Sequence, residues 1–566
     1  MAKLQPSPQQ QAFFDWIAND RGSLQLIARA GTGKTTALTG IRDPETGETL
    51  LDGAVHHMLR EADGRRISVF LGAFNRDISK ELGARVTGLP GIKAGTMHGA
   101  GFGACRKWSP ALERKDAVDE HKCRDIFDRL LLQQQMHDYE QTFCLKLASL
   151  AKQEGVGILA DGRDPQFWAA LVDRHDLEYD LLGPDAGGID GEEAAEMLDH
   201  AIESTKKVLR ESIKQNRERI DYDDMLYVPV FHNLRMWQND WMLMDEDQDA
   251  NRIRVALARK MLRPGGRFVG VGDDRQAIYG FTGADSDSIA NIIKAFNCKT
   301  LPLSVTYRCP KLVVALANTW VPDLEAHESA PEGEVRRISA EDFIKLAEGR
   351  QPLPHEHDWA RDVPPGAGDA VLCRNVKPLI ELAYRLIRAG RPVQVEGRDI
   401  GAGLLSLARR WKVNRLEALQ DRLAKFKTRE VEKWRARGKE QKAAAIEDKV
   451  ETLLVLIAGL LQDGKQTVAD LTALIESVFS DDARKNCLLL STVHKSKGKE
   501  WDRVFVLDRL NLMPSRWARQ DWQVQAEYNL LYVAVTRAKR VFVDIVMTPP
   551  KAEQPKTEAQ EPEAVK

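Results

Sequence analysis

Short apolar runs separated by longer amphipathic stretches recur along the chain. Residues 24–27, 67–74, 241–244 and 268–271 are mainly apolar runs of strand length, and polar residues or glycines follow each one. Such runs predict strands that are buried on both faces, as in a parallel sheet covered by helices. The pattern therefore predicts an α/β fold with polar residues gathered at the ends of buried strands.

Two segments show helical periodicity instead. Residues 105–220 predict a mainly helical insertion, which a glycine-rich loop at 183–191 interrupts and whose residues reveal no chemistry. Residues 401–485 predict a second insertion with two antiparallel helices that form a hairpin. The apolar positions of that hairpin are Leu416, Leu419, Leu423 and Phe426, and after Gly438 they are Ile446, Val450, Leu453 and Ile457.

The charge balance sets this second insertion apart. The 566 residues carry a formal net charge of −2, whereas residues 409–449 hold 14 Lys or Arg against 7 Asp or Glu. A basic helix pair can bind a nucleic-acid backbone. It can equally be a solvent-exposed pair whose charges form i,i+4 ion pairs. Both interpretations stay open. If the pair grips DNA, charge reversal at Arg429, Lys433 and Arg437 should weaken binding and flatten its salt dependence.

Composition limits the class of protein. Hydrophobic residues make up 43% and charged residues 29%, as in globular proteins, and the length favours several domains. The sequence shows neither an apolar run long enough to cross a bilayer nor the apolar core of a secretory signal. Seven dispersed cysteines without a Cys-x-x-Cys pair argue against a zinc or iron–sulfur site. We expect a cytoplasmic protein without membrane contact, whose residues 549–566 have the composition of a disordered tail.

A glycine-containing loop follows the first predicted strand. Its sequence is Ala28-Arg29-Ala30-Gly31-Thr32-Gly33-Lys34-Thr35-Thr36, and no helix breaker occurs before Gly40. Strand, glycine loop and helix start form the context of a P-loop, whose backbone N–H groups bind a polyphosphate. Lys34 would reach the β- and γ-phosphates of ATP, and the Thr35 hydroxyl would ligate Mg²⁺. The alternative is a glycine turn with an exposed lysine.

Polar residues at the ends of two later strands complete this chemistry. The strand at 241–244 leads into Asp245 and Glu246. Beside a P-loop, Asp245 would hold Mg²⁺ and Glu246 would polarise the attacking water. The strand at 268–271 leads toward Gln276, which is placed to sense a γ-phosphate. The alternative for the two carboxylates is an acidic junction without a catalytic role.

Further stretches offer groups for nucleotide or nucleic acid. Gln9 can donate and accept toward an adenine edge, although glutamines at a helix start are also common on solvated surfaces. Thr96 and His98 stand on a predicted turn that could hold a phosphodiester backbone or be a satisfied core turn. Tyr279 and Phe281 could present rings to bases, because stacking tolerates any sequence.

The order of these motifs resembles the superfamily 1 DNA helicases of the UvrD/Rep/PcrA type. The resemblance runs from about Gln9 to Lys539 and leaves the two insertions unmatched. Three downstream stretches extend it: Ser304-Val305-Thr306-Tyr307-Arg308-Cys309-Pro310, Ser491-Thr492-Val493-His494-Lys495-Ser496-Lys497-Gly498-Lys499-Glu500-Trp501 and Asn529-Leu530-Leu531-Tyr532-Val533-Ala534-Val535-Thr536-Arg537-Ala538-Lys539. The form Ser-Thr-Val-His-Lys-x-Lys-Gly is similar to the F-box DNA helicase branch.

The resemblance implies roles for residues of these downstream stretches. Tyr307 would stack on adenine, Arg308 would touch the γ-phosphate, and Arg537 would close on it as an arginine finger. The stretch that holds Glu500 would contact both ribose and DNA. The DNA-contacting set would then be Phe74, Thr96, His98, Tyr279, Phe281, Thr492 and His494.

Some positions depart from the family pattern. Ala28 replaces the first glycine of the general P-loop pattern, which the UvrD type also tolerates, whereas Arg29 replaces a small residue. Phe74 is followed directly by Asn75, one residue tighter than the Rep type, and Phe281 stands where many relatives carry tryptophan. Asp247 is a mild change within the acidic motif.

The resemblance implies two RecA-like parallel-sheet lobes, each with a mainly helical insertion. The expected bounds are 1–104 and 221–288 for the first lobe, 105–220 for its insertion, 289–400 and 486–548 for the second lobe, 401–485 for its short basic insertion, and 549–566 for the tail. ATP would lie between the lobes, and single-stranded DNA would cross both.

The implied activity is ATP-driven movement on single-stranded DNA, 3′ to 5′, with strand separation at single-strand/duplex junctions. It would serve repair, recombination or replication in a bacterial or phage-type setting, and the tail could bind a protein partner. Three rivals stay open: a translocase that displaces proteins with little unwinding, a helicase acting on RNA-containing duplexes, and a non-catalytic DNA-binding scaffold. An ATPase measurement separates the last from the others.

Overall fold

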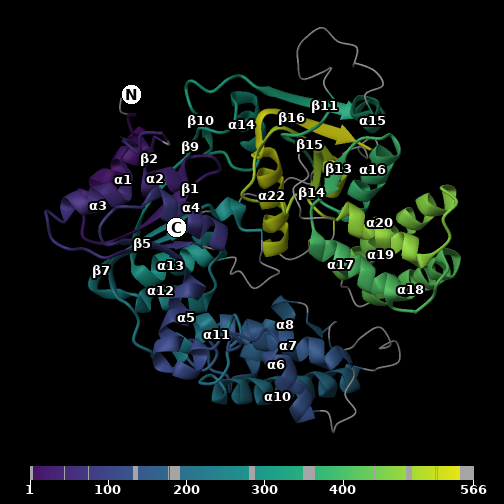
Figure 1. Cartoon of the computed structure of the whole chain (residues 1–566), viewed down its shortest axis with the longest axis horizontal. Helices are drawn as coiled ribbons and strands as arrows, with labels where there is room; N and C mark the ends of the chain where they lie inside the picture. The colour runs from purple at the N-terminus through teal and green to yellow at the C-terminus, as the bar shows by residue number, and fades with distance from the viewer. Residues whose placement is uncertain are drawn as a thin grey trace, which may run out of the picture. The chain divides into compact units, whose positions relative to one another are not determined.

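The chain forms two compact units, which we call unit 1 (Met1–Thr306) and unit 2 (Tyr307–Lys566) (Figure 1). The computed structural model describes residues 4–43, 45–73, 75–131, 138–175, 177–178, 181, 191–278, 287–348, 364–436, 440–479, 487–516, 518 and 521–547. The predicted boundary between lobes at 288/289 is wrong. Strand β8 (Cys298–Leu303) pairs along its length with β1 (Ser23–Ala28), so the chain leaves the first sheet only after β8.

Unit 1 is built on a six-stranded parallel sheet with the order β5-β4-β6-β7-β1-β8. Its other strands are β4 (Val69–Ala73), β5 (Ile92–Thr96), β6 (Asn239–Asp245) and β7 (Leu262–Gly272). The four apolar runs therefore form β1, β4, β6 and β7, which confirms that prediction. A two-stranded antiparallel hairpin, β2 (Ile41–Arg42) with β3 (Thr49–Leu51), follows the P-loop helix.

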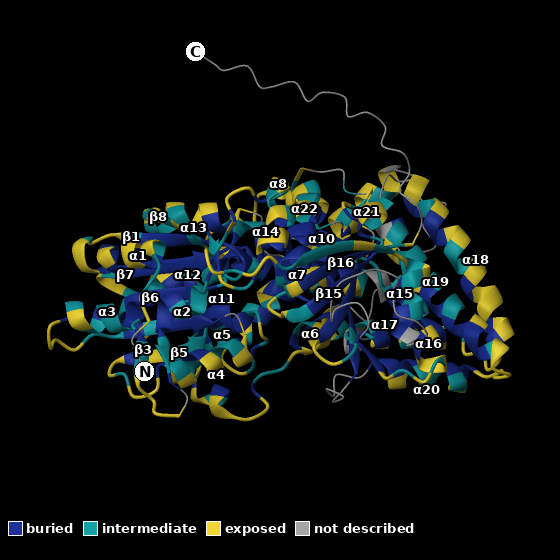
Figure 2. Cartoon of the chain, turned by 90° about the horizontal axis from the view of Figure 1, so that it is seen from above, coloured by how far each residue is buried: buried dark blue, intermediate teal, exposed yellow. Residues whose placement is uncertain are grey.

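The central strands β1, β4 and β6 and the later half of β7 are buried on both faces, and Figure 2 shows dark blue in the middle of this sheet. In β6, Trp241 and Leu243 belong to one apolar core, whereas Met242 and Met244 belong to another. The alternation follows from the two-residue period of a strand. Along the chain, these strands alternate with helices α1 (Pro8–Asn19), α2 (Lys34–Thr39), α3 (Ala54–Glu61), α4 (Arg76–Arg85), α12 (Arg252–Lys260) and α13 (Ser288–Phe296).

The first insertion is helical, as predicted. Its helices are α6 (Lys122–Leu131), α7 (Asp138–Gln153), α8 (Pro165–Arg174) and α10 (Gly191–Lys214), preceded by η1 (Pro110–Glu113) and followed by α11 (Asp224–Phe231). Helix α5 (Met97–Trp108) runs through the predicted boundary at 104/105. Phe143 and Leu147 of α7 share a core with Phe268 of β7, so the insertion is packed continuously onto the sheet.

Unit 2 contains a second six-stranded parallel sheet with the order β11-β16-β15-β12-β14-β13. Its strands are β11 (Glu334–Ser339), β12 (Asp369–Cys373), β13 (Val393–Val395), β14 (Leu488–Thr492), β15 (Trp501–Leu507) and β16 (Ala538–Val546). Its helices outside the insertion are α14 (Lys311–Ala317), α15 (Ala340–Glu348), α16 (Val376–Arg388), α21 (Arg509–Leu512) and α22 (Asp521–Val535). The α/β prediction with two parallel sheets is confirmed.

The second insertion contains α18 (Leu416–Ala436), α19 (Glu440–Gln462) and α20 (Val468–Val478). Lys427 pairs with Glu451, and the later Arg435 pairs with the earlier Glu440, so α18 and α19 run antiparallel as predicted. Helix α17 (Arg398–Arg409) crosses the predicted boundary at 400/401. Within the described part of the chain, no helix is both long and apolar enough to cross a membrane.

Candidate functional site

The P-loop connects the end of β1 to the start of α2. Gly31 and Gly33 have φ angles of 72° and 77°, in the left-handed region that favours glycine. Gly33 is the N-cap of α2, which begins at Lys34 and ends before Gly40. The glycines at these two positions therefore set the loop backbone that the sequence predicts.

Two carboxylates from the end of β6 meet this loop. The Lys34 Nζ lies 2.7 Å from Glu246 Oε1, and the Thr35 hydroxyl donates to Asp245 Oδ2 at 3.5 Å. Glu246 has a left-handed φ of 53°, which is uncommon outside glycine and typical of strained functional turns. Four residues predicted from two distant motifs thus lie together at the carboxyl edge of one sheet.

Burial and mutual repulsion govern the charges of this group. The pKa of Asp245 is raised to about 6, chiefly by burial and next by the neighbouring Glu246 carboxylate, while the charge of Lys34 acts against both. Burial alone would lower the pKa of Lys34, but the carboxylates of Glu246, Asp245 and Asp273 outweigh it and raise the pKa. The lysine is therefore held as a cation in a nearly enclosed position.

The same donor set fits Mg²⁺ with a nucleotide. Mg²⁺ binds one or two protein oxygens and completes its shell with phosphates and water. Asp245 and Thr35 supply a carboxylate and a hydroxyl within one hydrogen bond of each other. Lys34 and the P-loop N–H groups would receive the phosphates, with Lys34 exchanging its carboxylate partner for a phosphate oxygen.

Gln276 lies beside the loop on η4 (Asp274–Gln276), after β7. Its amide donates to Asp273 Oδ2 at 2.8 Å, and Asp273 also accepts from the Arg29 guanidinium at 2.9 Å. Arg29 further pairs with Asp274 at 2.5 Å. The arginine that departs from the family pattern is thus buried against carboxylates of the loop that holds Gln276.

A second network lies beneath the acidic motif, and sequence reasoning missed it. Asp247, on η3 (Asp247–Asp249), is 1% exposed and accepts from the Gln25 amide of β1 at 3.2 Å. Burial raises its pKa well above the usual range. A Cβ at Gly270 or Gly272 would lie about 2 Å from its carboxylate. Two features of the sequence could have indicated this network: a glutamine, Gln25, inside the apolar run of β1, and two glycines at alternate positions of β7.

Gln9 is engaged within unit 1. Its amide donates to Ser304 Oγ at 2.7 Å and accepts from Ser304 N–H at 2.8 Å. The predicted adenine-reading residue therefore anchors α1 to the segment that leads from β8 to β9 (Val305–Thr306). Tyr307 follows at once in sequence.

The predicted turn at 94–100 is a strand-to-helix junction instead. Thr96 ends β5 and caps α5, its hydroxyl accepting from Gly99 N–H at 3.0 Å. The Thr96 hydroxyl explains why a helix begins here and not a turn. At an N-cap, threonine accepts a hydrogen bond from a backbone N–H of the first helical turn that has no partner within the helix. His98 is half-buried on the first turn, and burial lowers its pKa to about 4, with Arg254 adding to the effect.

Unit 2 assembles its own cluster from three distant motifs. Arg308 Nε pairs with Glu500 Oε2 at 2.5 Å, and another Arg308 nitrogen donates to Thr536 O at 3.5 Å. Arg537 donates to Lys499 O at 3.1 Å. Two predicted phosphate-binding arginines and Glu500 therefore lie side by side. We call Arg308, Glu500 and Arg537 the arginine cluster.

The other predicted site residues of unit 2 are Tyr307, at the start of the unit, and Thr492 and His494, at the end of β14 and just after it. Tyr307 is 50% exposed, and its ring centroid lies 4.8 Å from that of His327, a neighbour that the sequence did not reveal. Thr492 is buried, and its hydroxyl accepts from Lys495 N–H at 3.4 Å. Burial lowers the pKa of His494 to about 3, and the charge of Arg374 contributes. Phe74, Tyr279, Phe281, Arg437 and the tail at 549–566 lie outside the described residues.

Comparison with known proteins finds relatives that are named as DNA helicases. UvrD2 of Mycobacterium tuberculosis, an ATP-dependent DNA helicase by name, is 25% identical over 92% of this chain and 76% of its own length. PcrA of Staphylococcus epidermidis is 24% identical over 53% of this chain, which spans only 38% of PcrA. Rep of Buchnera aphidicola is 32% identical over 111 residues.

Two family domains match nearly the whole described core. The UvrD/REP helicase N-terminal domain matches residues 8–297, and the UvrD-like helicase C-terminal domain matches residues 365–546. The first match contains the P-loop with its two carboxylates, and the second contains Glu500 and Arg537 of the arginine cluster. With these two matches and two parallel sheets, the chain belongs to the UvrD/Rep family of helicases.

Proposed function

We propose that this protein is an ATP-dependent DNA helicase that moves on single-stranded DNA and separates strands at single-strand/duplex junctions. The observation that carries the proposal is the meeting of Lys34 and Thr35 with Glu246 and Asp245 in unit 1. The relatives carry the name DNA helicase, which supports DNA as the substrate. The 3′ to 5′ direction and a role in repair, recombination or replication rest on the family resemblance.

In the proposed reaction, Lys34 and the P-loop N–H groups hold the β- and γ-phosphates. Mg²⁺, held by Thr35 and Asp245, would neutralise charge that develops on the phosphate oxygens. Glu246 would orient the attacking water once Lys34 turns to phosphate. Gln248 donates to Glu246 Oε2 at 2.6 Å and accepts from Asp273 N–H at 3.0 Å, so it links the water-orienting carboxylate to the Gln276 loop.

The arginine cluster would supply the remaining positive charge. A planar guanidinium suits a γ-phosphate, and an arginine finger stabilises charge in the transition state. Arg308 and Arg537 would act on the nucleotide that unit 1 holds, and their release after hydrolysis would drive movement along the strand. This assignment follows the family pattern of the downstream motifs.

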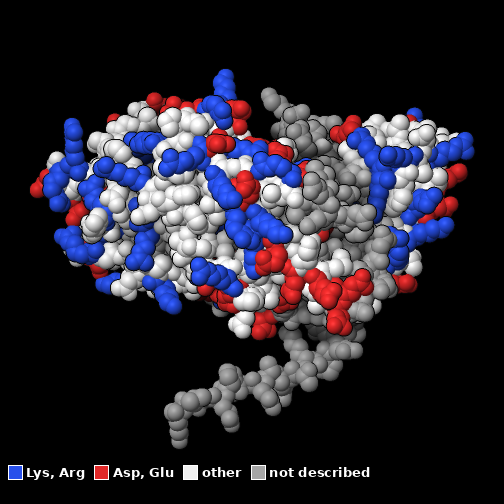
Figure 3. Space-filling view, turned by 90° about the horizontal axis from the view of Figure 1, so that it is seen from below, with Lys and Arg blue, Asp and Glu red and all other residues white. Residues whose placement is uncertain are grey.

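DNA contact must come from local groups. On the face drawn in Figure 3, lysines and arginines are scattered and acidic side chains gather in clusters between them. The formal net charge of −2 likewise gives no overall attraction to DNA. We propose backbone contacts at Thr96, His98, Thr492 and His494, and ring stacking at Phe74, Tyr279 and Phe281.

Substitution of Lys34 by alanine tests the nucleotide site. Lys34→Ala should abolish DNA-stimulated ATP hydrolysis, because the phosphates lose their main cation, and it should leave the unfolding temperature within a few degrees of wild type. Glu246→Gln should also lose hydrolysis, by about 10²-fold or more, while retaining ATP binding. Normal hydrolysis by Lys34→Ala would show that the site is assigned wrongly.

Strand-separation assays test the activity. ATP turnover with and without single-stranded DNA should be followed by unwinding of 3′-tailed and 5′-tailed duplexes, and we expect unwinding of the 3′-tailed duplex. Removal of a DNA-bound protein with little unwinding would indicate a translocase instead. Stronger stimulation by RNA than by DNA would indicate an RNA-directed enzyme.

A further inference from the structure

The first helical insertion contains a pocket whose lining includes none of the residues assigned to the nucleotide site. Its volume is about 410 Å³, and its walls come from the α7–α8 connection, from α8, α10 and α11. A cavity of this size is typical of sites that receive a ligand or a few side chains. The proposed function gives this pocket no role.

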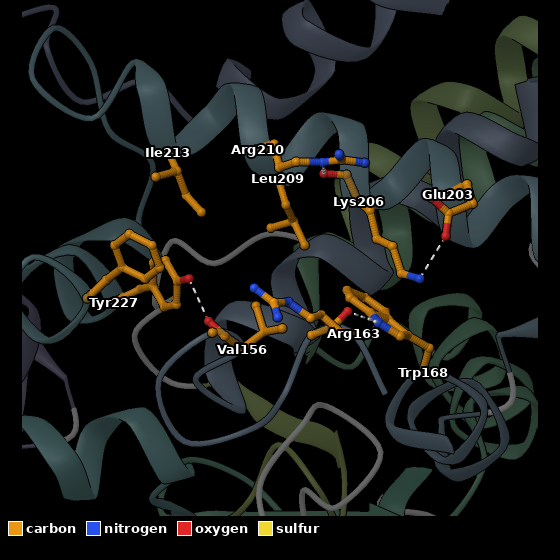
Figure 4. Close-up of a pocket in the computed structure, with 12 residues that line it drawn as sticks. Val156, Arg163, Trp168, Glu203, Lys206, Leu209, Arg210, Ile213 and Tyr227 are labelled. Atoms are coloured by element: carbon orange, nitrogen blue, oxygen red, sulfur yellow. Dashed lines mark hydrogen bonds and ion pairs between the residues drawn. The ribbon is translucent and has the colours of Figure 1, made fainter. Parts of the chain in front are cut away.

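The interior of the pocket is mainly apolar. Figure 4 shows Leu209 and Ile213 of α10 pointing toward Val156, with Tyr227 on one side and Trp168 on the other. The connection that supplies Val156 continues into Ile158 and Leu159, which are 38% and 39% exposed. The lining of the pocket thus offers aliphatic surface to a partner, and the connection next to it in sequence exposes two further aliphatic side chains.

The rim carries positive charge. Four charged side chains line the pocket, and one of them, Glu203, pairs with Lys206 at 2.7 Å. Arg163 and Arg210 remain as two exposed cations. The Arg210 Nε donates to Lys206 O at 3.2 Å, which holds this guanidinium along α10 at the edge of the pocket. The rim is therefore complementary to carboxylates.

The aromatic residues do not form a stacking platform for a nucleobase. Trp168 is 1% exposed, its indole N–H donates to Gly162 O, and the Lys206 ammonium lies 5.5 Å from its ring centroid. Tyr227 is fully buried, and its hydroxyl donates to Val156 O at 2.7 Å. Base stacking needs an open ring face, so the lining favours an aliphatic or aromatic side chain over a strand of DNA.

We propose that this pocket docks an acidic peptide segment of a partner protein. One apolar side chain of the segment enters between Leu209, Ile213 and Val156, and flanking carboxylates pair with Arg163 and Arg210. Arginine forks bind carboxylates in a bidentate manner, and pairing of an apolar anchor with charged flanks is a common mode of peptide recognition. The insertion thus serves as a partner-binding module of the enzyme.

The test uses the full-length protein and a fluorescein-labelled peptide, acetyl-Glu-Asp-Leu-Phe-Glu-Asp-amide. Fluorescence anisotropy should show saturable binding, and a peptide with serines in place of Leu and Phe should bind at least about tenfold more weakly. The double variant Arg163→Glu with Arg210→Glu should weaken binding of the first peptide by about tenfold or more. Both arginines are exposed, so the fold should survive.

A matched control changes the same charges elsewhere on the insertion. Lys207→Glu with Lys214→Glu alters two exposed lysines of α10 outside the pocket and should leave peptide binding unchanged. Equal binding by wild type and the Arg163/Arg210 variant, or no saturable binding at all, overturns the proposal. If the Arg163/Arg210 variant loses binding to labelled poly-dT but still binds the peptide, the pocket is a DNA site, and this result also overturns the proposal. DNA-stimulated ATPase, measured in parallel, reports on the proposed function separately.

Discussion

At the scale of single residues, buried charge organises the nucleotide site. Arg29 is 6% exposed and Asp273 is fully buried, so each charge is compensated largely by the other. Burial raises the pKa of Asp273, and the Arg29 and Lys34 charges act against that rise. Arg29 thereby ties the P-loop to the loop of Gln276, so the departure from the family pattern has a structural partner.

Removal of Arg29 should destabilise unit 1. Arg29→Ala leaves the Asp273 carboxylate buried without its main counter-charge, and we expect a loss of about 3 kcal/mol in the free energy of unfolding. Urea unfolding measures the change. Arg275→Ala is the control, because Arg275 is 37% exposed and its pair with Asp274 should contribute less than about 1 kcal/mol. Equal losses in both variants would contradict this account.

His494 should make stability depend on pH. Its pKa is about 3 in the folded protein against 6.5 ordinarily, so between these values the unfolded chain binds more protons. The contribution of neutral His494 to the free energy of unfolding is therefore complete above pH 6.5. It decreases as the pH drops below 6.5, by about 1 kcal/mol near pH 5.5. His494→Gln should remove this part of the slope in unfolding curves. His121→Gln, at an exposed histidine, should keep the wild-type slope.

At the scale of elements, the two helical insertions share cores with the sheets that they interrupt. Leu453 and Ile457 of α19 belong to the same apolar cluster as Val371 of β12 and Leu490 of β14. Ion pairs join α18 to α19 at Lys427 and Arg435, so these two basic side chains are neutralised within the hairpin. Figure 2 shows exposed positions in yellow along α18, so one side of this helix meets solvent.

Charge reversal on α18 separates the two interpretations of its basic surface. Arg429→Glu with Lys433→Glu should weaken binding to single-stranded DNA and lower the slope of log affinity against log salt by up to about two. Thermal unfolding must accompany the titration, because Arg429 also pairs with the buried Glu430 at 3.2 Å. Lys207→Glu with Lys214→Glu on α10 is the control. Unchanged affinity across the salt series would exclude α18 as a DNA contact.

At the scale of the whole molecule, each unit brings together motifs that lie far apart in sequence. In unit 1 the P-loop meets carboxylates from β6, and in unit 2 Arg308 meets Glu500 and Arg537. Parallel sheets cause this convergence, because their strand ends meet at one edge. In unit 1 the carboxyl ends of β1 and β6 meet, whereas in unit 2 Glu500 and Arg537 directly precede β15 and β16 at the amino ends of those strands. The proposed catalytic cycle requires both groups to act on one nucleotide.

Substitution within the arginine cluster tests that requirement. Arg537→Lys should lower DNA-stimulated ATP turnover by about 10³-fold while leaving ATP binding intact, because the loop that binds ATP belongs to unit 1. Lysine is chosen because it keeps a long cationic side chain at a position where Arg537 donates to Val533 O and Lys499 O. Arg503→Lys, at a buried pair with Asp369, is the control and should keep turnover within about threefold. Normal turnover in Arg537→Lys would refute the finger role.

The sequence by itself determined the strands, the P-loop and the carboxylates that end β6, because burial on both faces and glycine at positive φ leave local signatures. It also determined the antiparallel hairpin through apolar spacing. Only the tertiary structure decided the partners: Asp273 for Arg29, Gln25 for Asp247, Ser304 for Gln9 and His327 for Tyr307. It also decided that β8 closes the first sheet. Such contacts join residues distant in sequence, and their energy depends on burial that arises only when the sheets are packed.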